Sequence, residues 1–143
     1  MRIIYLLLLI LLMVADADAK VPSNTVRTTD IKDICTTLTS TIRNVPQSVK
    51  KAVYKRDGGD LSKSGSYEVD HRISLTVGGT NDINNLKLQS YTGSCNAHHK
   101  DKLEVRFHSL VCKGKLSVSD AQDTLYNNWE DGYKKHIDAN GCK

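Results

Sequence analysis

Alternating apolar and polar side chains predict a pair of strands in the middle of the chain. The alternation runs from Tyr67 to His71 and predicts a short β-strand, and residues 86–88 predict a second one. Between them stands Gly78-Gly79, where two residues without side chains permit the sharp reversal that paired strands require. We therefore expect a two-stranded unit over residues 67–88.

Apolar residues at helical spacing predict three helices around these strands. Pro46, followed by an apolar face at residues 49, 52 and 53, predicts a helix that ends before Asp57. One apolar stripe predicts a helix over residues 96–112 that Gly114 ends. The stripe consists of Leu103, Phe107, Leu110 and Val111. A second apolar stripe predicts a single C-terminal helix, capped by Ser117 or Ser119 and ended by Asn140-Gly141. This stripe consists of Val118, Ala121, Leu125, Trp129 and Tyr133.

The remaining segments carry weaker patterns. Residues 20–30 are polar without periodicity, which predicts a loose N-terminal arm. Residues 31–38 carry apolar side chains at helical spacing, but the Thr-rich stretch 36–41 favours extended backbone, so both structures stay open. The Gly, Ser and Asp residues of 57–66 predict a surface loop.

Residues 1–19 have the features of a secretory signal peptide. Arg2 supplies a positive charge, residues 3–14 are apolar, and Ala15-Asp16-Ala17-Asp18-Ala19 places small residues at the cleavage positions. The apolar run is shorter than the roughly 20 residues of a transmembrane helix, although a membrane-anchored, outward-facing domain is the alternative. Residues 20–143 then form one exported domain, of a length typical for a single core.

Charge and cysteine content agree with export. The 143-residue chain carries a formal net charge of +4, which suits a polyanionic partner without requiring one. It contains 4 cysteines, and an even number in an oxidising compartment favours two disulfides. Spacing alone leaves all three pairings open, and Cys95-x-x-His98 has the spacing of a zinc pair unless Cys95 is in a disulfide.

An adjacent aspartate and histidine at the end of the first strand, Asp70 and His71, are candidates for phosphodiester hydrolysis. That reaction needs a base for the attacking water and a cation on the phosphate oxygens. A carboxylate is a hard ligand for Mg²⁺, Mn²⁺ or Ca²⁺, and an imidazole with an unperturbed pKa of about 6.5 accepts a proton near neutral pH. Neighbouring side chains on a strand point to opposite sides, so both reach one phosphate only if the strand bends there.

The residues around this pair form an ordered motif. It reads Glu68-x-Asp70-His71-x-Ile73-x-Leu75, then Gly78-Gly79, then Asn84-Asn85-Leu86, then Asn96-Ala97-x-x-Lys100-Asp101-x-Leu103-Glu104. This order resembles the HNH (ββα-metal) endonucleases, and among them the small exported HNH nucleases. The resemblance implies an α+β fold with a ββα-metal core and additional helices, stabilised by disulfides. Ser74 departs from the family's usual proline, and the chain has no Cys-x-x-Cys pair for a structural zinc.

The resemblance also implies roles for single residues. His71 corresponds to the general base, Asp70 and Asn96 correspond to ligands of one divalent metal ion, Mg²⁺ or Mn²⁺, and Asn85 to the asparagine that braces the loop between the strands. Further contacts to metal or phosphate are expected from His98, His99 and Lys100. The family pattern implies the disulfides Cys35–Cys112 and Cys95–Cys142. On other grounds, Asn96 is also a favoured helix N-cap, and Trp129 belongs to an apolar face that predicts core.

The expected function is that of a secreted, extracellular, metal-dependent endonuclease, a monomer that no longer contacts the membrane once the signal is removed. Its expected partner is DNA, with RNA as a second candidate, and low sequence specificity is expected because no base-reading module accompanies the motif. One alternative is a secreted effector or binding protein on an inactive HNH fold. Another is a disulfide-stabilised structural domain in which the motif has no chemical role.

Overall fold

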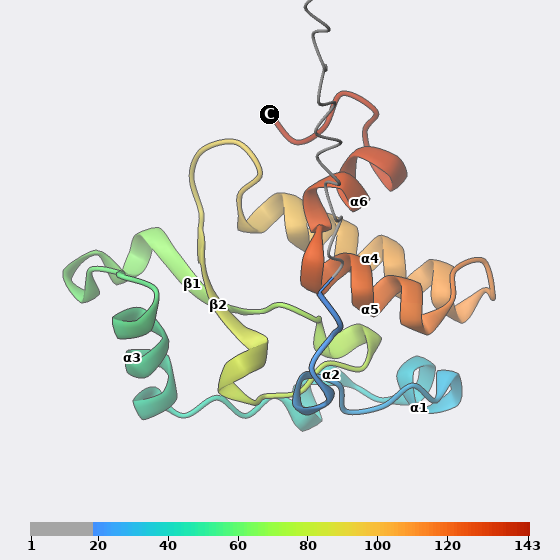
Figure 1. Ribbon diagram of the computed structural model, residues 1–143, viewed down its shortest axis with the longest axis horizontal. Coiled ribbons are helices and arrows are strands. Elements are labelled where there is room, and N and C mark those ends of the chain that lie inside the picture. Colours follow the sequence, from blue (N-terminus) through green and yellow to red (C-terminus); the bar gives the residue numbers. More distant parts are fainter. Residues whose placement is uncertain (1–18) are drawn as a thin grey trace, which may run out of the picture.

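The computed structural model describes residues 19–143, so the predicted signal peptide lies outside the described residues except for Ala19. The fold is α+β, as predicted (Figure 1). Its helices and strands are α1 (Ile31–Thr36), α2 (Thr39–Ile42), α3 (Gln47–Arg56), β1 (Tyr67–His71), β2 (Leu86–Ser90), α4 (Ala97–Cys112), α5 (Val118–Asn127) and α6 (Trp129–His136). No helix within residues 19–143 is long and apolar enough to cross a membrane.

The predicted strands pair in an antiparallel sheet of two strands. Asp70 lies opposite Lys87, and His71 lies opposite Leu86. Because opposite residues share a face and successive residues alternate, the Asp70–Lys87 pair and the His71–Leu86 pair lie on different faces. Helix α3 lies on one side of the strands, and α4, α5 and α6 lie on the other (Figure 1).

The connection between the strands depends on two residues of the motif. Asn85 is fully buried; its Oδ1 accepts a hydrogen bond from the backbone N–H of Ile73, and its Nδ2 donates to the carbonyls of Ile73 and Thr80. A Cβ at Gly79 would lie 1.9 Å from the Ile73 carbonyl oxygen, so only glycine fits there. The loop is therefore closed by one amide side chain and one close backbone approach.

The core lies between α4 and the C-terminal helices. The predicted α4 stripe is confirmed, because Leu103, Phe107 and Val111 are completely buried. They share one apolar cluster with Ala121 and Leu125 of α5. Burying a large aliphatic or aromatic side chain contributes about 1.5–3 kcal/mol, so this stripe is the main attachment of α4.

The predicted single C-terminal helix is wrong, because the structure divides it into α5 and α6. The break is at Asn128, whose backbone angles of φ −156° and ψ 55° are not helical. The apolar spacing from Val118 to Tyr133 continues across the break, which is why periodicity did not reveal it. Ser117 caps α5, and α6 ends at His136 rather than at Asn140-Gly141.

The expected loose N-terminal arm is also wrong. Thr25 is fully buried, and Val26 forms a β-bridge with Gly79. The N–H of Arg27 donates to the carbonyl of Gly78 at 2.7 Å. The arm therefore holds the glycine turn in place. The two structures left open for residues 31–41 both occur: α1 and α2 are short helices separated by extended backbone at Thr37 and Leu38.

Two disulfides join distant parts of the chain. Cys35 in α1 is bonded to Cys112 at the end of α4, and Cys95 before α4 is bonded to Cys142 near the C-terminus. This is the pairing that the family resemblance implies. Since Cys95 is oxidised, the zinc pair that its spacing with His98 allowed is excluded.

Candidate functional site

A buried ammonium group joins β1 to α4. The Nζ of Lys100 lies 2.6 Å from Oδ2 of Asp70 and also donates to the backbone carbonyl of His71 and to the carboxylate of Glu104. These three acceptors use all three N–H bonds of the ammonium. Lys100, which is 3% exposed, is therefore not free to bind phosphate, contrary to one of the expectations for it.

The electrostatics of this cluster follow from its burial. Burial disfavours the ammonium form of Lys100, but the negative charges of Glu104 and Asp70 outweigh this effect and raise the pKa of Lys100 above its usual value. Burial raises the pKa of Glu104, and the neighbouring Lys100 only partly offsets this. The cluster therefore holds a charged ammonium between two carboxylates at the end of β1.

The imidazole of His71 lies away from the Asp70 carboxylate. The strand keeps its alternation through His71, and the chain bends directly after it, at residues 72 and 73. His71 is 3% exposed, so the fold encloses most of its ring. Its Nε2 lies 3.0 Å from Oδ1 of Asn81, in the loop that follows β1.

Asn81 fixes the protonation state of the His71 ring. Its Nδ2 donates to the carbonyl of Ile42 at 2.8 Å, and its Oδ1 accepts the backbone N–H of Asn44 at 3.3 Å. Since Oδ1 can only accept, Nε2 of His71 must carry the proton, and in the neutral ring Nδ1 carries the lone pair. Burial lowers the pKa of His71 more than the Asn81 hydrogen bond raises it, so the ring is neutral near pH 7.

The Nδ1 atom of His71 is the free end of this ring. It forms no hydrogen bond within residues 19–143, and no buried side-chain nitrogen or oxygen of these residues lacks a partner. It follows that Nδ1 is reached by solvent. An accessible lone pair on a neutral, oriented imidazole is what a general base requires.

Asn96 and the two histidines after it form the beginning of α4. The Oδ1 of Asn96 accepts the backbone N–H groups of His98 and His99, so Asn96 is the N-cap. The Nδ1 of His99 lies 3.0 Å from the same oxygen, and its ring packs edge-on against Tyr133. His98 stacks on Tyr91. These contacts give Asn96, His98 and His99 structural roles.

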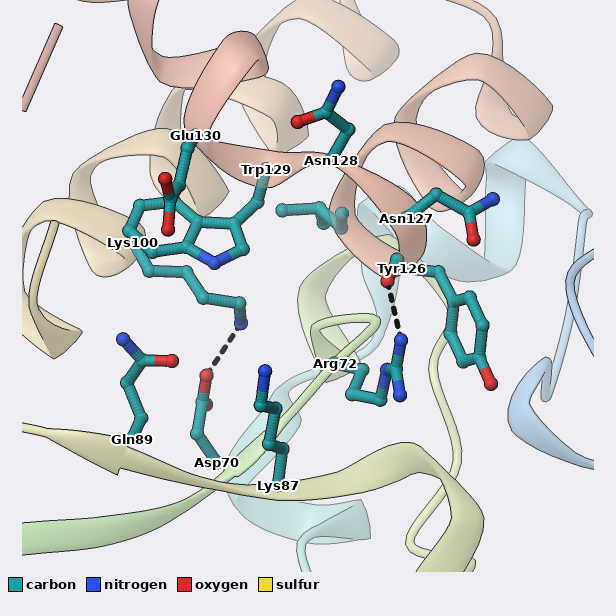
Figure 2. Close-up of a pocket in the computed structure, with 11 residues that line it drawn as sticks. Asp70, Arg72, Lys87, Gln89, Lys100, Tyr126, Asn127, Asn128, Trp129 and Glu130 are labelled. Atoms are coloured by element: carbon teal, nitrogen blue, oxygen red, sulfur yellow. Dashed lines mark hydrogen bonds and ion pairs between the residues drawn. The ribbon is translucent and has the colours of Figure 1, made fainter. Parts of the chain in front are cut away.

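A cavity of about 250 Å³ lies on the Asp70 face of the sheet. Figure 2 shows Asp70 and Lys87 pointing from the strands toward Trp129, which begins α6. The side chains that line it include Arg72, Gln89, Lys100, Tyr126 and Glu130. Trp129 is therefore a wall of this cavity as well as a partly buried neighbour of the core.

The residues of this cavity fit a divalent metal in part. Asp70 lines the cavity and its Oδ1 forms no hydrogen bond to any described residue, whereas Asn96 is not among the residues that line it. No group of three or more His, Cys, Asp or Glu residues placed to hold a metal occurs in residues 19–143. Mg²⁺ is commonly held by one or two carboxylates, with waters and substrate phosphates as the other ligands. Asp70 fits that mode, and Asn96 does not.

Two residues of the site escaped the sequence analysis. Asn81 stands beside the glycine turn, where asparagine usually bonds its own backbone, and nothing in its spacing relates it to His71. Glu104 belongs to the quoted motif, and its i,i+4 spacing from Lys100 is a recognisable signal for a helical ion pair. Its burial with Asp70 depends on tertiary packing.

The comparisons with known proteins add no further assignment. No protein family, no curated protein and no solved structure matches this chain. The arguments for function therefore rest on the residues and geometry described above.

Proposed function

We propose that the protein is a phosphodiester hydrolase that cleaves nucleic acid, an endonuclease of the HNH type, with His71 as its general base. The observation that carries this proposal is the state of the His71 ring. Asn81 holds Nε2 as the donor, which leaves the accessible Nδ1 as the acceptor. The element order β1, β2, α4 and the ordered motif around Asp70 and His71 support the same function.

In the proposed reaction, Nδ1 of His71 takes a proton from the attacking water. The hydrogen bond from Nε2 to Asn81 holds the ring in place and stabilises the imidazolium that forms. The ammonium of Lys100 lies beside Asp70, holds that carboxylate in position and offsets part of its negative charge. General acid–base catalysis of this kind contributes typically about 10²–10⁴-fold.

Asp70 would hold the proposed metal ion, Mg²⁺ or Mn²⁺, through its Oδ1, together with oxygens of the substrate. A metal bound there would neutralise charge on the phosphate oxygens. The adjacent Lys100 ammonium reduces the negative charge of the Asp70 site. We therefore expect weak metal binding in the absence of a phosphodiester and stronger binding in its presence.

The proposed setting is outside the cell. The two disulfides of the described chain are compatible with an oxidising compartment, and the features of residues 1–19 favour export. DNA is the first candidate substrate and RNA the second. We expect a monomer that cleaves with little sequence preference.

Two observations favour the second candidate, a binding or effector protein on an inactive fold. Asp70 is already paired with an ammonium, and Asn96 is occupied as a helix cap. Under this alternative the cluster of Lys100, Asp70 and Glu104 serves only to attach α4 to β1.

A cleavage assay tests the proposal. Disulfide-intact protein comprising residues 20–143 is incubated with supercoiled plasmid and with single-stranded DNA and RNA, with Mg²⁺ or with chelator. We expect cleavage with Mg²⁺ and at least a hundredfold loss in His71→Ala and His71→Gln, of which His71→Gln preserves most of the side-chain volume. His108→Ala on the far half of α4 is the matched control and should keep full activity. Near-normal cleavage by folded His71 variants overturns the mechanism. An inactive wild-type protein on all three substrates favours the binding protein.

A further inference from the structure

We propose that the cavity beside Asp70 is a phosphate-binding subsite that holds a phosphate of the nucleic-acid strand next to the one cleaved. Arg72, Lys87 and the indole N–H of Trp129 would be its donors. The inference rests on the proposed function and assigns to the substrate a second point of contact, on the other face of β1 from the His71 ring.

The charges of the cavity favour an anion. Its lining contains three cationic side chains, Arg72, Lys87 and Lys100, against the carboxylates of Asp70 and Glu130. Lys100 is neutralised by its ion pairs, whereas Arg72 and Lys87 form no ion pair with any carboxylate in the described part of the chain. Two unpaired cations in one hollow concentrate positive potential there.

Arg72 is held in an orientation that leaves donors free. Its guanidinium lies 3.9 Å from the centroid of the Tyr126 ring, and its Nη2 donates to the Tyr126 carbonyl at 2.9 Å. This stacking orders the side chain before any ligand arrives, which reduces the entropic cost of binding. The remaining N–H groups of the guanidinium form no bond to other described residues and are the fork that matches phosphate oxygens.

Lys87 and Trp129 approach the same space from opposite walls. Figure 2 shows the Lys87 amine rising from β2 and the indole nitrogen of Trp129 directed down toward it. Neither nitrogen has a hydrogen-bond partner among residues 19–143, and both residues line the cavity. Three kinds of N–H donor therefore converge on one hollow, with Arg72 as the third.

The hollow continues into a neighbouring depression. Arg72 and Lys87 line this depression too, together with Arg56 of α3 and its ion-pair partner Asp57, so Arg72 and Lys87 are its unpaired cations. Asp70, His71 and Arg72 follow one another at the end of β1, so a strand that crosses this end meets the imidazole on one side and the guanidinium on the other. The arrangement suits a polyanion better than a single phosphate ion.

Fluorescence of Trp129 reports on this site directly, because it is the single tryptophan of the chain. Single-stranded (dT)8 is titrated into the His71→Gln protein with chelator present, so that no cleavage occurs. We expect a saturable change in emission, with Kd increased about tenfold in Arg72→Gln and in Lys87→Gln, which corresponds to one good phosphate contact. Each substitution should also lower the slope of log Kd against log salt by roughly 0.7, as expected for one phosphate contact to a single strand.

Matched controls and a second probe separate the outcomes. Lys113→Gln and Lys115→Gln, beyond the end of α4, should leave Kd unchanged. Inorganic phosphate should bind much more weakly than (dT)8, and equal affinity would overturn the strand proposal in favour of a free-phosphate site. No emission change overturns the subsite even if the wild-type protein cleaves DNA. A Kd that stays at the value of the His71→Gln parent in both cavity variants overturns it as well. Binding without cleavage by wild type overturns the proposed function and leaves the subsite standing.

Discussion

Replacing Lys100 by methionine tests the buried cluster at the base of the site. Methionine keeps the apolar stem but removes the ammonium that contacts Asp70 and Glu104. Breaking a buried ion pair by removing one partner typically costs about 3–5 kcal/mol, because a charge stays buried without compensation. The full range applies here because Lys100 is 3% exposed and the side chain of Glu104 is 14% exposed.

The expected loss is large against the stability of such a domain. The free energy of unfolding of such domains is about 5–15 kcal/mol, so Lys100→Met removes a substantial part of this stability. With a urea m-value of roughly 2 kcal/mol/M, a loss of about 4 kcal/mol lowers the unfolding midpoint by about 2 M. Lys102→Met on the exposed face of the same helix is the matched control and should stay within roughly 0.5 kcal/mol.

A second substitution shows whether the buried charge is the cause. Glu104→Leu in the Lys100→Met background removes the stranded carboxylate and should recover most of the loss, since apolar replacements of buried pairs are often neutral.

The pH dependence has a definite sign. The pKa of Glu104 is raised in the folded protein by burial, so the folded state binds more protons than the unfolded state between the usual carboxyl pKa and the raised value. Stability of Lys100→Met therefore increases as pH falls from neutral toward the usual carboxyl range. A loss below about 1 kcal/mol, or no recovery in the double variant, would refute a buried ion pair between α4 and β1.

Three further predictions concern the metal, a disulfide and the glycine turn. Chelator should stop cleavage and Mg²⁺ or Mn²⁺ should restore it, with less effect from Zn²⁺, because Asp70 offers hard oxygens; a chelator-resistant activity would remove the metal from the proposal. Cys35→Ser/Cys112→Ser should lose about 4 kcal/mol in denaturant unfolding, since the bond joins residues separated by 77 positions; an unchanged midpoint would contradict this. Gly79→Ala should cost about 3 kcal/mol, because the new Cβ would collide with the Ile73 carbonyl; a stable variant would mean that the loop shifts freely.

Local patterns predicted the elements that carry the site. Alternation from Tyr67 to His71 and the stripe from Leu103 to Val111 identified β1 and α4, because burial of one face imposes those periods on the sequence. The break at Asn128 was missed because the apolar spacing of α5 continues into α6. The buried arm around Thr25 was missed because its contacts are backbone hydrogen bonds to Gly78 and Gly79, which leave no hydrophobic signature.

The candidate site was predicted less completely than the fold. Asp70, His71 and Asn85 stood out through the motif, and the brace by Asn85 agrees with its expected role. The contacts of His71 with Asn81 and of Asp70 with Lys100 join residues 10 and 30 positions apart. Such contacts depend on how the loop and α4 pack against β1, and no local pattern encodes them.

The pH profile of cleavage tests the central claim, that Nδ1 of His71 acts as the base while Asn81 holds Nε2. Initial rates under kcat/KM conditions are measured at constant ionic strength for wild type, Asn81→Ala and Asn81→Asp. The wild-type rate should rise with pH to a plateau, with a midpoint below the usual histidine value of 6.5, because burial lowers the pKa of His71. Asn81→Ala should move the midpoint to lower pH, since the lost hydrogen bond raised the pKa, and Asn81→Asp should move it to higher pH, since a carboxylate stabilises the imidazolium. A midpoint that is the same in all three proteins would contradict the assignment of His71 as the base.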